Sequence, residues 1–94
     1  FKHEEAFRQE VFLAIIMIPL ALYLGENGIE RAFMISAIIL IIIVELLNTG
    51  IEAVTDRVSL DHHELAKRAK DIGSAAVMLS FIYTSIVWII LIIN

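Results

Sequence analysis

The spacing of charged residues constrains this chain more than any other feature. All 18 charges fall into three clusters, with five at 2–10, three at 26–31 and ten at 45–71. Uncharged runs of 15, 13 and 23 residues follow these clusters, at 11–25, 32–44 and 72–94. A bilayer requires about 20 predominantly apolar residues per helix. The pattern therefore predicts a helical protein embedded in a membrane.

Composition leads to the same class of protein. The chain has 94 residues, 60% of them apolar and 19% charged, with a mean hydropathy of +0.86. A soluble domain has about 45–50% apolar and ~25% charged residues, and a small domain buries only about 60% of its surface. A soluble bundle of long apolar helices is the alternative. The run at 38–44 is apolar on every side, however, which requires lipid or a deep core.

Several classes of function are excluded by absent residues. The chain has no cysteine, which rules out disulfides, thiolate metal sites and thiol nucleophiles. Its net charge of −4 argues against nucleic acid as a partner. No glycine-rich phosphate loop or protein-kinase motif is present.

We expect an all-α fold with three transmembrane helices, forming a single membrane domain over 1–94. The expected helices cover about 5–24, 29–58 and 64–93, with a tight Gly- and Asn-containing turn at 25–28. The middle uncharged run is too short to span a bilayer, so its helix must continue through Glu45. Pro19 is compatible with a transmembrane helix.

The basic residues predict the orientation of the chain. One side would carry six of them and the other side only Arg31; the six are Lys2, Arg8, Arg57, Lys67, Arg68 and Lys70. By the positive-inside rule, the N-terminus and the loop at 56–71 are cytoplasmic, and the C-terminus lies outside.

Glu45 is the most informative residue, because ionisable groups inside a span are costly and usually functional. Asn48, Thr49, Glu52 and Asp56 follow it on the same helix face. Glu45 and Glu52 are about 10 Å apart along the axis at 1.5 Å per residue. Polar residues also hold membrane helices together, but two carboxylates on one face favour a functional role.

The third helix carries a stripe of small residues at Ala69, Gly73, Ala76, Ser80 and Thr84, which predicts close packing against the second helix or another subunit. Lys70 and Ser74 share a face near its start; a lysine there also suits snorkelling to the interface. Spacing alone leaves two classes open, an enzyme at the membrane surface and a small proton- or cation-coupled transporter. A scaffold would not explain the two carboxylates.

Three segments carry a resemblance to a known family. They are EEAFRQE at 4–10, VELLNTGIEAVTDR at 44–57 and HELAKRAKDIGSAAV at 63–77. The combination of ExxNxxxExxxD on an apolar helix with AKDxGSAAV closely resembles the signature of the bacterial integral-membrane diacylglycerol kinases. These segments cover over a third of the chain.

The resemblance implies a Mg²⁺-dependent homotrimer in the bacterial inner membrane. It would make phosphatidic acid from ATP and diacylglycerol, with active sites between subunits. It implies Glu45 as the general base and Glu4 and Glu52 as metal ligands. The implied ATP-binding residues are Glu4, Asn48, Glu52, Asp56, Asp61, His62, His63, Lys70 and Asp71. The implied lipid-substrate residues are Gln9, Arg31, Glu45, Ser74 and Trp88.

The resemblance also carries two further expectations. The family's N-terminal amphipathic surface helix is expected to be missing from this chain. A related branch phosphorylates undecaprenol, but the residues at 7–10 and 72–74 look more like the diacylglycerol branch. Undecaprenol kinase activity is therefore the alternative function.

Overall fold

The computed structural model describes the backbone of residues 2–58 and 64–93, and the side chains of 8–57 and 64–93. Three α-helices form this part of the chain: α1 (Lys2–Leu24), α2 (Gly28–Val58) and α3 (Glu64–Ile93). The predicted all-α fold with three helices is confirmed, although α1 begins earlier than expected. The run at 32–44 does continue helically through Glu45, as the sequence predicts.

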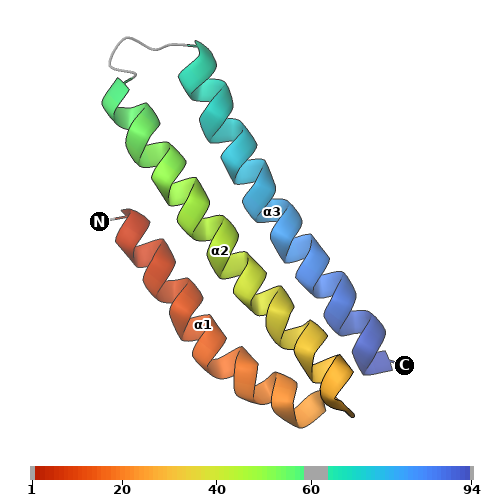
Figure 1. The fold of residues 1–94 in the computed structure, drawn as a ribbon. Helices are drawn as coiled ribbons and strands as arrows, with labels where there is room; N and C mark the ends of the chain where they lie inside the picture. Colours follow the sequence, from red (N-terminus) through yellow and green to blue (C-terminus); the bar gives the residue numbers. More distant parts are fainter. Residues whose placement is uncertain (1, 59–63, 94) are drawn as a thin grey trace.

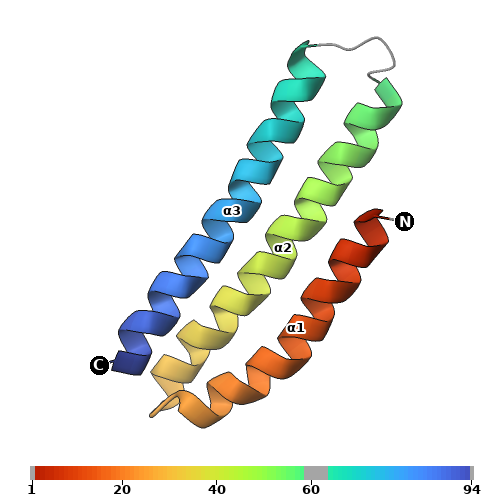
Figure 2. The ribbon, with the colours of Figure 1, turned by 180° about the vertical axis from the view of Figure 1, so that it is seen from behind.

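The three helices lie side by side in one layer, with α2 in the centre (Figures 1 and 2). The molecule measures 52 × 22 × 15 Å, which is roughly one helix thick in its shortest direction. α1 is shorter than α2 and begins beside the middle of it, so the polar end of α2 extends beyond α1 (Figure 1). α3 accompanies α2 over most of its length.

Two of the helices are long and apolar enough to cross a membrane, at Gly28–Arg57 and Glu64–Ile93. α1 is not among them; it carries five charges within 2–10. A single layer leaves large apolar side chains exposed on all three helices, as at Phe12, Leu47 and Met78. Exposed apolar surface on this scale is typical of contact with lipid or another protein.

The apolar core lies toward the turn between α1 and α2. Its buried members come from all three helices: Ala14, Ala21, Met34, Ala37, Ile38 and Trp88. Within 8–24, the buried residues of α1 are alanines, and small side chains let two backbones approach closely. The core therefore fastens one end of the layer and leaves the other end to polar contacts.

The turn at 25–27 is fixed by side chains of the sequence around it. Asn27 accepts a hydrogen bond at its Oδ1 from the amide of Glu30 (2.9 Å), and the Glu30 carboxylate accepts one from the amide of Glu26 (3.0 Å). These bonds satisfy donors at the start of α2. Arg31 Nε donates to the carbonyl of Gly25 (3.1 Å), beyond the end of α1. The predicted tight turn is thus present.

Two side-chain hydrogen bonds join α3 to the backbone of α2. Thr84 Oγ1 lies 3.2 Å from the carbonyl of Ala37, and Trp88 Nε1 donates to the carbonyl of Met34 at 3.2 Å. The buried face of α3 consists of Gly73, Ser80, Thr84 and Trp88. Three residues of the predicted small-residue stripe are on it, but Ala76 is exposed. Half-buried Val77 lies one helical turn after Gly73 instead.

Candidate functional site

The candidate site is the polar face of α2, which we define as Glu45, Asn48, Glu52 and Asp56. Steps of three and four residues keep these side chains on one side of the helix. The first three are half-buried, and Asp56 is exposed near the end of the helix. Leu46, Leu47 and Val54 lie elsewhere on the helix surface and are exposed. Amphipathicity along this part of α2 therefore turns the acids toward the neighbouring helices.

Glu45 meets a second acid from α1. The side chain of Glu10 neighbours that of Glu45, and its Oε1 atom is buried without a hydrogen-bond partner among the described residues. The sequence-based list of site residues missed Glu10. Its position as the last charge before the uncharged run at 11–25 is the signal that could have identified it.

Asn48 faces α3 at Gly73. A Cβ atom on Gly73 would collide with Oδ1 of Asn48 and would lie 3.2 Å from its Cγ. Asn48 Oδ1 is buried and accepts no hydrogen bond from any described residue. Buried polar atoms without partners are rare and often mark the position of a missing ligand, ion or water. The glycine thus makes room for an amide whose acceptor remains available.

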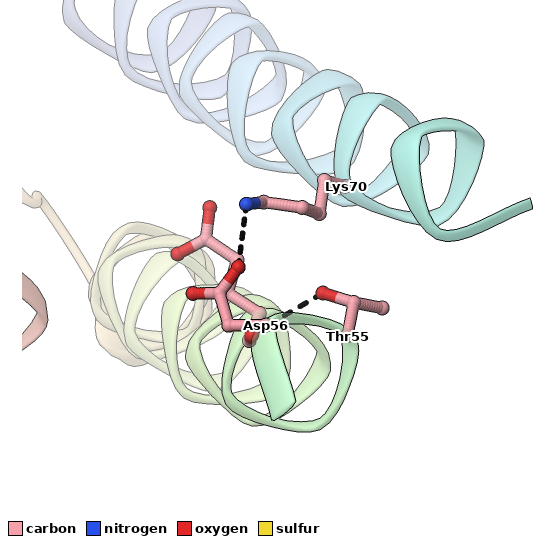
Figure 3. Close-up of polar contacts among 4 residues, drawn as sticks. Thr55, Asp56 and Lys70 are labelled. Carbon is pink, nitrogen blue, oxygen red and sulfur yellow. Dashed lines mark hydrogen bonds and ion pairs between the residues drawn. The ribbon is translucent and has the colours of Figure 1, made fainter. Parts of the chain in front are cut away.

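Lys70 reaches from the second turn of α3 to Asp56 on α2. Its Nζ atom lies 2.6 Å from Asp56 Oδ1, and both side chains remain about half exposed (Figure 3). Glu52 also interacts favourably with the Lys70 charge. Thr55 donates from Oγ1 to the Glu52 carbonyl (3.2 Å), which keeps its hydroxyl group on its own helix. A basic side chain therefore stands beside two acids of the polar face.

Other predicted site residues lie elsewhere. Ser74 and Asp71 are exposed near the start of α3, and Gln9 is exposed on α1. Trp88 is buried against Met34, roughly 16 Å from Glu45 along the axis at about 1.5 Å per residue. It does not occupy an exposed interfacial belt.

Arg31 is at the same end of the layer as Trp88, bonded to the turn. The structure thus brings Glu45, Asn48, Glu52, Asp56 and Lys70 to one region and leaves Arg31 and Trp88 apart from it. Glu4 belongs to the first turn of α1, but its side chain is not described. Asp61, His62 and His63 lie outside the described residues.

The oxygen atoms of the polar face fit a hard cation only in part. Glu52 supplies a carboxylate and Asn48 an unused amide oxygen, and Mg²⁺ prefers oxygen ligands. Among the described side chains, no group of three acidic, histidine or cysteine residues could hold a metal. Mg²⁺ usually keeps several waters and binds through one or two carboxylates plus substrate phosphates. The described residues therefore suit a metal that arrives with a phosphate ligand.

The fold and the site together define a small helical membrane protein with acids on an apolar helix. Residues 1–92 match the family described as prokaryotic diacylglycerol kinase. A diacylglycerol kinase of Haemophilus influenzae is 51% identical over 88 residues, which cover 94% of this chain and 75% of that protein.

Two further relatives have the same name. The diacylglycerol kinase of Escherichia coli K12 is 46% identical over 89 residues, covering 95% of this chain and 73% of the relative. That of Pseudomonas aeruginosa is 49% identical over 88 residues, with 94% and 72% covered. The chain therefore belongs to the prokaryotic diacylglycerol kinase family, which confirms the resemblance and makes it an enzyme of the kinase class.

Proposed function

We propose that this protein transfers the γ-phosphate of ATP to the primary hydroxyl group of diacylglycerol, producing phosphatidic acid at the cytoplasmic face of the membrane. The observation that carries the proposal is the half-buried carboxyl group of Glu45, placed on an apolar helix beside Glu10 and on the same face as Glu52. The relatives named diacylglycerol kinase support the choice of acceptor.

Phosphoryl transfer needs chiefly positioning and neutralisation of charge. Glu45 is the proposed general base, which accepts the proton of the lipid hydroxyl where the helix enters the apolar layer. Lys70 would contribute a positive charge and N–H donors to the phosphates. Asn48 offers its free Oδ1 between these groups.

The proposed metal ligands are Glu4 and Glu52, and Mg²⁺ bound with ATP would supply neutralisation of phosphate charge. Asp61, His62, His63 and Asp71 are proposed near the nucleotide. Gln9, Arg31, Ser74 and Trp88 are proposed for the lipid. These assignments rest on the resemblance of the sequence segments that contain them.

We also propose a homotrimer in which α1 is the third span of each protomer and residues 1–94 form one membrane domain. The support is the single layer: the polar face of α2 has α1 on one edge and α3 on the other, and Glu45, Asn48 and Glu52 are only half-buried between them. A second copy would close the site and cover exposed apolar side chains. The N-terminus and the 56–71 loop would be cytoplasmic, with the C-terminus periplasmic.

The test is an ATP-dependent phosphorylation assay on the purified protein in mixed micelles, with diacylglycerol and undecaprenol offered in parallel. We expect labelled phosphatidic acid, and Glu45→Gln should reduce turnover by at least ~10², the lower range for loss of a general base. Glu26→Gln, an exposed acid in the opposite turn, is the matched control and should retain activity.

Three results would contradict the proposal. Near-normal turnover in Glu45→Gln would refute the assignment of the base. Preferential labelling of undecaprenol would refute the acceptor. Transport of a substrate across the vesicle membrane, driven by a pH gradient and without any lipid labelling, would instead identify a transporter.

A further inference from the structure

An ion pair between Asp56 and Lys70 joins the polar face of α2 to α3. Lys70 Nζ lies 2.6 Å from Asp56 Oδ1, across the gap between the last turns of α2 and the second turn of α3 (Figure 3). A lysine has a long, flexible stem, and ordering it costs side-chain entropy. The contact holds the ammonium group in one place before any ligand arrives.

The geometry leaves the ammonium group able to bind a further anion. An ammonium group has three N–H donors, and the contact with Asp56 Oδ1 occupies one of them. The Lys70 side chain is 41% exposed, so a ligand can reach it. Asp56, in contrast, would repel a triphosphate unless a cation lay between them.

The position of Glu52 indicates where the held charge would act. Glu52 lies one helical turn before Asp56 on α2 and interacts with the Lys70 charge. If Glu52 carries the metal of the nucleotide, the phosphates must lie beside it. The contact with Asp56 would then keep the Lys70 ammonium group next to those phosphates.

We propose that Asp56 is a positioning residue, which holds the Lys70 ammonium group beside Glu52 to receive the phosphates of ATP. This inference rests on the kinase function proposed above. An exposed ion pair contributes little to folding stability. We therefore expect the Asp56–Lys70 contact to affect nucleotide binding more than stability. The role therefore predicts a change in the KM for ATP without a change in unfolding.

The experiment compares Asp56→Asn, Asp56→Glu and Lys70→Met in mixed micelles, with the KM for MgATP, kcat and resistance to unfolding by SDS measured for each. We expect Asp56→Asn to raise the KM about two- to fivefold, the range that an exposed ion pair supplies. Asp56→Glu should restore most of the affinity. Glu64→Gln, an exposed acid at the same end of the molecule, is the control for the lost charge.

A double variant separates a positioning role from direct binding. If Asp56 acts through Lys70, Asp56→Asn should have no further effect on the KM of Lys70→Met. An additive increase would show that Asp56 contacts the metal or nucleotide itself and would overturn the inference.

Two other results would also overturn it. A lowered KM in Asp56→Asn would mean that Asp56 competes with phosphate for Lys70. An unchanged KM, with or without weaker resistance to SDS, would mean that the pair has no part in nucleotide binding. A wild-type protein without lipid phosphorylation would refute the proposed function, which is a separate outcome.

Discussion

Adding one methyl group at Gly73 or at Gly50 should have opposite effects on the stability of the protein. Both glycines are within helices, where alanine is favoured by about 1 kcal/mol over glycine. A Cβ on Gly50 would meet nothing within 4 Å, so Gly50→Ala should stabilise by up to about 1 kcal/mol. A Cβ on Gly73 would collide with Asn48.

The cost of the collision follows from what surrounds Asn48. The Asn48 side chain is short and its Oδ1 is buried. Either this side chain must leave its present rotamer or α3 must move away from α2. Overpacking of this kind costs about 1–3 kcal/mol. The gain in helix propensity is the same for both glycines. The difference in unfolding free energy between the two variants should therefore be about 1–3 kcal/mol, with Gly73→Ala the less stable.

The assay is equilibrium unfolding by SDS in mixed micelles. Trp88 is the single tryptophan of the chain and is buried between α3 and α2, so its fluorescence reports separation of these helices. Combining Gly73→Ala with Asn48→Ala should abolish the deficit, because the colliding atoms are gone. Equal unfolding transitions for Gly73→Ala and Gly50→Ala would refute the proposed contact. If Asn48 lines the site, Gly73→Ala should also lose activity that Gly50→Ala keeps.

Three further changes test the other end of the molecule by the same SDS unfolding assay. Trp88→Phe removes the hydrogen bond to Met34 and should destabilise by about 0.6–2 kcal/mol. Because this variant lacks the only tryptophan, its unfolding and that of the wild type are compared by circular dichroism; unchanged unfolding would show that this bond contributes nothing. Asn27→Ala removes the N-cap of α2 and should cost about 1 kcal/mol, whereas Asn27→Asp should restore nearly all of it. Gly25→Ala places a Cβ 2.5 Å from Arg31 Cγ and 3.0 Å from the carbonyl oxygen of Ala21, and should cost about 1–3 kcal/mol; unchanged unfolding would contradict this close packing.

Charge spacing was sufficient to predict three helices, and the Gly and Asn residues at 25–28 predicted the turn, because each depends on local sequence. It also placed Glu45, Asn48, Glu52 and Asp56 on one face, since that follows from helical period alone. Contacts between helices were harder to predict. Period 3.6 places Ala76 and Val77 almost equally well against Gly73, and only the rotation of α3 about its axis decides between them.

Glu10 and Trp88 show the same limit for individual residues. The contact of Glu10 with Glu45 depends on how far α1 lies along α2, which no pattern within α1 specifies. A late tryptophan in an apolar helix is usual at a membrane interface, but a buried indole needs a hydrogen-bond acceptor. The carbonyl of Met34 supplies that acceptor, and whether a carbonyl is within reach depends on the packing of two helices.

The contacts that join the three helices are distributed unevenly between the two ends of the layer. The core, the capped turn and the Trp88 and Thr84 hydrogen bonds all join the helices at the end with the α1–α2 turn or along its half of the molecule. At the other end, the Lys70–Asp56 pair joins α3 to α2, and an exposed ion pair of this kind is weak. Stability is therefore concentrated away from the polar face of α2. That face can exchange its internal contacts for those of a ligand or a second subunit while the opposite end holds the helices together.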